Sequence, residues 1–92
     1  MIVKARFHGI LADWVSTETV TFHMDSGSIY GDLLKQIGDR FAESMPEQLW
    51  DKISGKFNSS ILVMGKGRNL ESLETPLKSG EEITFYLMLA GG

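Results

Sequence analysis

The chain has 92 residues, which fits one small domain, together with a net charge of −3 and no cysteine. The missing cysteine excludes disulfides, thiolate metal sites and a cysteine nucleophile, and the acidic balance disfavours nucleic acid, whose phosphates need a concentrated basic face. The sequence holds no apolar stretch that could span a bilayer, and its start, MIVKARF, lacks the apolar region of a signal peptide, so we expect a cytoplasmic protein.

The first two predicted elements are strands at residues 2–7 and 18–24, where apolar and polar side chains alternate. Their apolar sides hold Val3, Ala5, Phe7, Val20, Phe22 and Met24. The stretch between them, HGILADWVST, is too long for a tight hairpin turn. We expect a wide loop or a short helical turn there that buries Leu11, Trp14 or Val15. The chain therefore opens with two antiparallel strands.

From residue 28 the apolar residues recur with the period of a helix. The apolar face of this helix holds Ile29, Leu33, Leu34, Ile37 and Phe41. Ser28 is the predicted N-cap, and Asp32 favours the positive end of the helix dipole. Gly31 and Gly38 weaken the helix, but each allows close packing against the sheet.

The stretch SMPEQLWDKI predicts a second, short helix. Ser44 and Glu47 have the spacing of a capping box, and proline is tolerated in a first helical turn. Its buried stripe holds Leu49, Trp50 and Ile53. The following SGKFNSS is predicted to be a loop.

Residues 61–64, ILVM, form a short continuous apolar run that predicts a strand buried on both faces. GKGRN then predicts a hairpin turn, and SLETPLKSGEE predicts a polar connector. The last run, ITFYLML, alternates again. One side holds Ile83, Phe85, Leu87 and Leu89, and the other holds Thr84, Tyr86 and Met88.

This order of elements predicts an α+β protein of the β-grasp type. We expect a mixed sheet of four to five strands, packed on one main helix with a short second helix. The domain is predicted to span residues 1–89, with residues 90–92 as a flexible C-terminal Gly-Gly tail.

The sequence gives little indication of an enzyme. His8 and His23 have no acidic partner at metal-ligand spacing, so each is predicted to be an edge or surface histidine. GKGRN lacks the phosphate-loop spacing, and the acidic residues lie along helical surfaces. We find no combination of nucleophile, base and oxyanion site, and we predict that the chain does not catalyse a reaction on its own.

The end of the chain is more informative. Strand alternation directs Tyr86 and Met88 away from the core, so a pair of apolar side chains lies on the outer face of the last strand. Because Gly91 and Gly92 have no side chains, their backbone can thread a narrow channel and place the terminal carboxylate in another protein. From the alternation we predict a partner-binding surface of Tyr86, Met88, Leu89 and Ala90.

These segments resemble the ThiS/MoaD sulfur-carrier family, the prokaryotic relatives of ubiquitin. The resemblance covers nearly the whole chain, in VKARFHGILAD, SIYGDLLKQIGDRF, ILVMGKGRNL, LETPLKSGEEITF and LAGG. Its most specific part is a leucine, Thr75-Pro76-Leu77, Gly80 with Glu81 and Glu82, an apolar strand and Gly-Gly.

The length is closer to MoaD, the small subunit of molybdopterin synthase, because ThiS proteins are shorter and lack room for the insertion around residues 44–60. The chain departs from the family at Met64, where asparagine is frequent, and in YLML, where prolines often precede the tail. These departures concern the partner more than the carrier role.

The resemblance implies that Gly92 is the reactive residue and that Gly91 and Gly92 form the functional tail. A ubiquitin-activating-like adenylyltransferase would use Mg-ATP to convert the Gly92 carboxylate into an acyl-adenylate. A persulfide from another protein would then replace AMP and leave a thiocarboxylate. In the MoaD case the sulfur goes to a pterin precursor in the large subunit of molybdopterin synthase, and in the ThiS case to the thiazole of thiamin. The carrier itself binds no cofactor and no metal.

Three alternatives remain open. A ubiquitin-like protein modifier would begin with the same adenylate and end in an isopeptide with lysine. A carrier for cysteine, another sulfur metabolite or a tungsten cofactor would differ only in the acceptor. A non-catalytic β-grasp interaction module, in which Gly-Gly is incidental, is less consistent with the combined motif and terminus.

Overall fold

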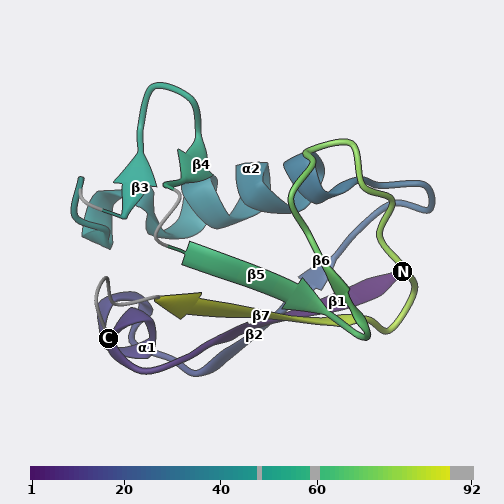
Figure 1. The fold of residues 1–92 in the computed structure, drawn as a ribbon, viewed down its shortest axis with the longest axis horizontal. Helices are drawn as coiled ribbons and strands as arrows, with labels where there is room; N and C mark the ends of the chain where they lie inside the picture. Colours follow the sequence, from purple (N-terminus) through teal and green to yellow (C-terminus); the bar gives the residue numbers. More distant parts are fainter. Residues whose placement is uncertain (48, 59–60, 88–92) are drawn as a thin grey trace.

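The computed structural model describes residues 1–47, 49–58 and 61–87. In this part of the chain a five-stranded sheet packs on a long helix, and a two-stranded hairpin stands beside that helix (Figure 1). The strands are β1 (Ile2–Phe7), β2 (Thr19–His23), β3 (Trp50–Asp51), β4 (Lys56–Phe57), β5 (Ile61–Gly65), β6 (Arg68–Asn69) and β7 (Glu82–Leu87). The helices are α1 (Ile10–Val15), α2 (Tyr30–Phe41) and a 3-10 turn, η1 (Ala42–Ser44). None of the helices in these ranges is long and apolar enough to cross a membrane.

Strand β7 lies at the centre of the sheet. It pairs in parallel with β1 and antiparallel with β5, and β2 and β6 complete the order β2-β1-β7-β5-β6. The parallel pair needs a crossover, which α2 provides on one face of the sheet. The predicted α+β fold, with a mixed sheet and one main helix, is therefore confirmed.

The core lies between the sheet and α2. Alternate residues of three strands face it, as the period of two predicted, and the buried ones are Val3, Ala5, Phe7, Val20, Phe22, Ile83 and Phe85. Phe85 is at the centre, with its ring stacked on Phe7 at 5.3 Å between centroids and 5.1 Å from the ring of Phe57. Leu87 is half-buried and packs against the edge of this cluster.

Helix α1 fills the wide connection between β1 and β2. Leu11 and Val15 are buried beneath it, as predicted, while the side chain of Trp14 lies outside what the structure describes. The helix ends at Ser16, whose φ of 61° lies in the left-handed region and whose N–H donates to the Ala12 carbonyl. The prediction of a short helical turn at this position is confirmed.

The start of α2 differs from the prediction by one residue. The N-cap is Ile29, and the Ser28 hydroxyl instead donates to the Asp25 carbonyl at 2.7 Å. The Asp32 carboxylate accepts a hydrogen bond from the Ile29 N–H at 2.9 Å, so its predicted place at the positive end of the helix is correct. The prediction of Ser28 as the cap is wrong because its hydroxyl closes the preceding turn.

The connector between β6 and β7 caps α2 instead. The Tyr30 N–H donates to the Thr75 carbonyl at 2.8 Å, and the Gly31 N–H donates to the Leu73 carbonyl at 2.8 Å. Main-chain carbonyls thus pair first-turn amides that a side-chain cap would otherwise pair. Gly31 allows this approach, because a Cβ there would lie 3.2 Å from the Leu73 oxygen. Its predicted close packing is therefore against the connector and not against the sheet.

The segment predicted as a second helix instead leads into a hairpin, in which β3, at its residues 50–51, pairs antiparallel with β4. Leu49 and Trp50 are buried, as predicted, but Ile53 is 98% exposed between the two strands. Lys56 and Phe57, predicted to lie in a loop, form β4. Both predictions are wrong, and the short helical segments found among the described residues are α1 and η1.

Local hydrogen bonds explain the turn between β3 and β4. Asp51 Oδ1 accepts from the N–H groups of Ile53 at 2.9 Å and Ser54 at 3.3 Å. These bonds hold the pKa of the Asp51 carboxyl below its ordinary value, and the bond from Ile53 has the largest effect. Gly55 then adopts a φ of 68°, in the left-handed region that glycine enters without strain.

Long-range packing holds the hairpin in place. The Trp50 ring meets the Phe57 ring edge-on at 4.9 Å and lies directly against Gly38 of α2. A Cβ on Gly38 would lie 2.8 Å from Trp50 Cζ2, closer than real Cβ atoms approach other atoms. Gly38 therefore makes room for a tryptophan of the hairpin, and its predicted packing against the sheet is wrong. The predicted boundary between residues 1–89 and the tail lies outside the described residues.

Candidate functional site

The predicted site is the C-terminal tail with the strand before it. Tyr86 lies in β7 and is half-buried, on the face opposite to the buried Phe85. The rest of the predicted site lies outside the described residues, namely Met88, Leu89, Ala90, Gly91 and Gly92. The structure thus places Tyr86 at the end of β7 that leads into the tail, and the role of the tail stays a prediction.

Tyr86 belongs to a small cluster on the outer face of the sheet, which we call the outer patch and which consists of His8, Leu62, Met64 and Tyr86. Tyr86 faces Leu62 directly across the β5–β7 ladder. The His8 ring meets the Tyr86 ring edge-on, with 5.0 Å between centroids. Met64 is 36% exposed and, with Tyr86, lines a depression of about 440 Å³.

Strand β5 contributes to this patch because one of its faces is open. The continuous run ILVM predicted a strand buried on both faces, but only Ile61 and Val63 are buried. Leu62 is half-buried and Met64 is exposed. The prediction is wrong because α2 covers one face of the sheet and no described element covers the other over these residues.

Sequence analysis found Tyr86 but missed its neighbours. His8 follows β1, and Leu62 and Met64 lie in β5, and long-range pairing fixes the register of both strands with β7. The alternation of burial along β5 was masked because all four residues of ILVM are apolar. The pairing of this strand with the last one, which follows from a β-grasp topology, was the signal that could have found Leu62.

The other end of the outer face is charged. Arg6 Nη1 lies 3.6 Å from Glu82 Oε1, and both side chains are about half exposed. An exposed ion pair of this kind adds about 0 to 1 kcal/mol to stability. The outer face therefore changes from charged at the start of β7 to apolar at its end, where the chain leads into the tail.

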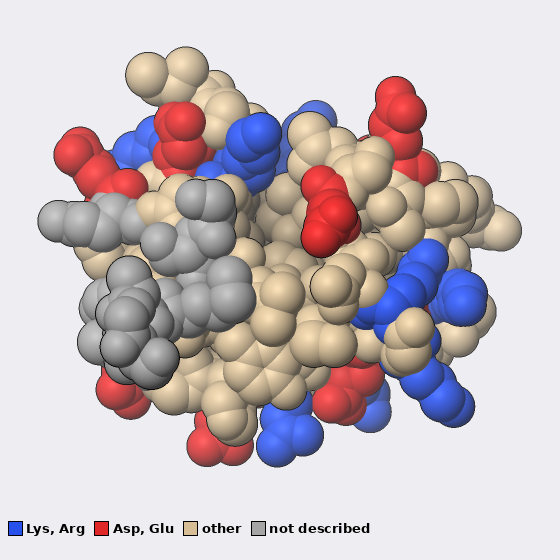
Figure 2. Space-filling model, viewed as in Figure 1, with Lys and Arg blue, Asp and Glu red and all other residues tan. Residues whose placement is uncertain are grey.

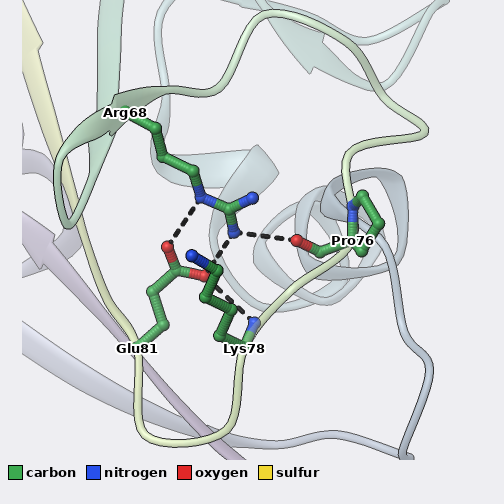
Figure 3. A network of polar contacts seen from close by, with 4 residues as sticks. All are labelled: Arg68, Pro76, Lys78 and Glu81. Atoms are coloured by element: carbon green, nitrogen blue, oxygen red, sulfur yellow. Dashed lines mark hydrogen bonds and ion pairs between the residues drawn. The ribbon is translucent and has the colours of Figure 1, made fainter.

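A buried ion pair holds the chain just before β7. Glu81 is 5% exposed, and its carboxylate accepts from Arg68 Nε at 3.0 Å and from Arg68 Nη2 at 2.7 Å (Figure 3). The Lys78 N–H also donates to Glu81 Oε1 at 3.1 Å, and Arg68 Nη2 donates to the Pro76 carbonyl at 2.8 Å. The pair thus joins β6 to the connector and to the start of β7.

Two glycines make this arrangement possible. A Cβ on Gly65 would collide with Glu81 Oε2, so a side chain there would displace the carboxylate from its present position against Arg68. Gly80 has a φ of 78°, and its N–H donates to the Ile2 carbonyl at 2.7 Å. The Gly-Glu pair at 80–81 is therefore a structural motif that turns the connector into β7 and buries a carboxylate.

The ionised form of Glu81 is favoured in the fold. Burial disfavours the charge, but the hydrogen bonds from Arg68 and from the Lys78 N–H, together with the charges of both residues, outweigh it. The pKa of the Glu81 carboxyl consequently lies below its ordinary value. Glu81 is thus a structural anion and not a proton donor near neutral pH.

The described ranges contain no group of three or more His, Asp or Glu side chains placed to hold a metal ion. His8 is engaged with Tyr86, and His23 is an exposed residue at the end of the edge strand β2, as predicted. Lysine and arginine side chains are interspersed with acidic ones on the face seen in Figure 2.

No family model and no curated protein matches this sequence. Solved structures do match it. SAMP1 from Haloferax volcanii aligns with a TM-score of 0.81 at 18% identity, over 100% of both chains. A putative molybdopterin converting factor subunit 1 from Pyrococcus furiosus gives 0.74 at 16% identity, over 97% of this chain and 99% of that one. A complex of subunits 1 and 2 of the molybdopterin-converting factor from Helicobacter pylori gives 0.65 at 21% identity, over 100% of both chains.

At these identities the likeness shows a shared fold. The matched chains are an archaeal modifier protein and converting-factor subunits, and the Helicobacter pylori structure holds two different subunits together. The chain has the ubiquitin-like β-grasp fold of these proteins, as its resemblance to the ThiS/MoaD family implied.

Proposed function

We propose that this protein is a sulfur carrier whose Gly92 carboxylate is adenylated and converted to a thiocarboxylate, and that the sulfur serves molybdopterin synthesis. The observation that carries the proposal is the position of β7. This strand is the centre of a β-grasp sheet, presents Tyr86 on an apolar outer patch, and leads within five residues to Gly91-Gly92.

A central strand suits a carrier because its position is fixed from both sides. β1 and β5 pair with β7, and the Arg68–Glu81 ion pair fixes its start. The end of β7 at Leu87 therefore stands in a constant relation to the outer patch. A partner that docks on the patch receives the tail at a defined place, which lowers the entropic cost of bringing the carboxylate to a reacting group.

The chemistry that we propose requires two other proteins. Attack of the Gly92 carboxylate on the α-phosphate of ATP forms an acyl-adenylate and releases pyrophosphate. A donor persulfide then displaces AMP and forms an acyl disulfide, and a second donor thiol reduces that bond. The products are a thiocarboxylate on Gly92 and a disulfide on the donor. Mg-ATP belongs to the adenylyltransferase, and this chain supplies the carboxylate and the docking surface.

The proposed acceptor protein is a large subunit of molybdopterin synthase. Support comes from the matched converting-factor subunits of Pyrococcus furiosus and Helicobacter pylori, the second of which is a two-subunit complex. The TM-score of 0.81 with an archaeal modifier protein favours a second candidate function, in which the same adenylate leads to an isopeptide with lysine. A ThiS-like carrier for thiamin thiazole is less consistent with the length of the chain.

The test is a reconstitution with the adenylyltransferase of the same organism, Mg-ATP and a persulfide donor, followed by addition of the large subunit and its pterin precursor. The carrier function predicts a thiocarboxylate that disappears as the pterin gains sulfur. Conjugates of higher mass on lysines of added proteins would establish the modifier function instead. A thiocarboxylate that the large subunit cannot discharge would overturn the molybdopterin assignment while retaining the carrier.

A further inference from the structure

A second surface lies on the helix side of β5. A cavity of about 460 Å³ separates the β3–β4 hairpin from the connector between β6 and β7. Tyr30 and Leu34 of α2 line it from below, Lys56 and Phe57 line one wall, and Leu70 and Glu71 line the other. Figure 1 shows the hairpin and the connector standing on either side, and the face in Figure 2 is hollowed between them.

The pairing of β7 fixes which backbone groups of β5 face this cavity. The Phe85 carbonyl accepts from the His8 N–H at 3.1 Å, so Phe85 directs its backbone groups toward β1. Because these directions alternate along a strand, Tyr86 directs its groups toward its partner on β5, Leu62. The residues on either side of Leu62 therefore direct their backbone groups away from β7.

Those neighbours are Ile61 and Val63, and half of their backbone groups are paired. The Ile61 N–H donates to the Asn58 carbonyl at 3.1 Å, and the Val63 carbonyl accepts from the Leu70 N–H at 2.9 Å. Over the described ranges the structure shows no partner for the Ile61 carbonyl or the Val63 N–H, because the β5–β6 ladder covers only Met64 and Gly65. These two groups form a short open sheet edge that borders the cavity, and Ile61, Leu62 and Val63 all line it.

An open sheet edge beside an apolar cavity can bind an extended peptide. A carbonyl and an N–H two residues apart are satisfied together by the main chain of an extended peptide, which offers a donor and an acceptor at strand spacing. Side chains of such a strand alternate in direction, so one of them enters the cavity between Leu34, Phe57 and Leu70. Tyr30 lines the cavity floor, and burial raises the pKa of its hydroxyl.

The two walls carry opposite charges, from Lys56 on β4 and Glu71 on the connector. We propose that this groove binds an extended peptide segment of a partner protein as a strand added to the edge of β5, with an aliphatic side chain in the cavity. The segment carries an acidic residue at the end beside Lys56 and a basic residue at the end beside Glu71. The proposal does not depend on the chemistry of the tail.

The test uses two synthetic nine-residue peptides and the full-length ¹⁵N-labelled protein. One peptide alternates Thr and Val around a central Leu, with Asp first and Lys last, and the other has the reverse sequence. We expect saturable shifts at the amides of Ile61, Leu62 and Val63 with one of the two, together with slower exchange of the Val63 N–H. N-methylation of the central peptide residues should weaken binding about fivefold to tenfold, because it removes backbone hydrogen bonds.

Matched variants locate the site. Lys56→Glu should weaken the preferred peptide at least threefold, whereas Lys52→Glu in the same hairpin, which does not line the cavity, should leave binding unchanged. Leu73 also lines the cavity, so Leu73→Ser should weaken binding. Ile2 does not line it but is equally exposed, at 43% against 42% for Leu73, so Ile2→Ser should leave binding unchanged. Failure of both peptides to bind, shifts confined to β2 or to His8 and Tyr86, or indifference to N-methylation would overturn the proposal. Concentration-dependent shifts of the same amides without peptide would overturn it in favour of a second copy of the chain.

Discussion

The ring of Tyr86 on β7 meets the ring of His8, the residue after β1, edge-on at 5.0 Å, while the His8 N–H donates to the carbonyl of Phe85 at 3.1 Å. Backbone and side chain of one residue thus both contact β7, the backbone through a hydrogen bond along its edge and the side chain on its outer face. The contact holds the aromatic ring of Tyr86 on the outer face, a few residues before Gly92 in the sequence.

Replacement of Tyr86 tests whether the outer patch is a docking surface. In Tyr86→Ala the adenylyltransferase should show a KM for the carrier about tenfold higher in ATP–pyrophosphate exchange, because an aromatic anchor is lost. The free energy of unfolding should fall by only about 1 kcal/mol, since the ring is half-buried. Thr21→Ala, on the outer face of β2, is the matched control and should change neither quantity. An unchanged KM for Tyr86→Ala would argue against docking at this patch.

Replacement of Glu81 tests the buried ion pair. Glu81→Gln should lower the free energy of unfolding by about 3 kcal/mol, because Arg68, whose side chain is only 23% exposed, loses a buried charged partner. The neighbouring Glu82→Gln breaks only the exposed pair with Arg6 and should cost less than about 1 kcal/mol. Chemical denaturation of the two variants measures the difference. Equal losses would show that burial of Glu81 contributes nothing.

The same carboxylate makes a pH dependence testable. The pKa of Glu81 is lowered from an ordinary value of 4.5, so its ionised form stabilises the fold above that value. This stabilisation is lost as the pH falls through 4.5 toward the pKa of the folded state. The difference in free energy of unfolding between the natural chain and Glu81→Gln should therefore be constant near neutral pH and shrink below about pH 4.5. A difference that persists or grows on acidification would contradict this.

For Gly38→Ala, helix propensity and packing predict changes of opposite sign in the free energy of unfolding. Helix propensity alone would make Gly38→Ala stabilising by about 1 kcal/mol. The added Cβ would lie 2.8 Å from Trp50 Cζ2, however, so we expect a net loss of about 1 to 2 kcal/mol as the hairpin shifts. Asp39→Ala, at an exposed position of the same helix, should be neutral or slightly stabilising. A raised unfolding temperature for Gly38→Ala would mean that the contact with Trp50 is unimportant.

Local sequence signals predicted most of the sheet and the main helix. The period of two in β1, β2 and β7 and the helical period after Ser28 are visible without tertiary information, and together they gave the β-grasp fold. The segment from Ser44 to Ile53 was mispredicted because its capping spacing is a weak local preference. Burial of Trp50 against Gly38, which is a long-range contact, decides its structure.

Only part of the candidate site, too, could be predicted from local sequence. Tyr86 could be predicted from alternation alone, since the residue lies in a strand with a clear period. Leu62 and His8 join it through strand register, which a single sequence does not specify. Glu81 was part of a sequence motif whose reason, burial against Gly65 and Arg68, became visible only when β6 and the connector were in place.

The most direct test of the carrier function is the intact mass of the protein before and after incubation with the adenylyltransferase, Mg-ATP and the persulfide donor. The mass before incubation verifies that Gly92 is the last residue. We expect an ATP-dependent gain equal to the exchange of one oxygen for one sulfur, and no gain in a variant that lacks Gly92 but keeps the same unfolding midpoint. No ATP-dependent change in the natural chain, or an equal gain in the shortened one, would contradict the assignment of Gly92 as the sulfur carrier.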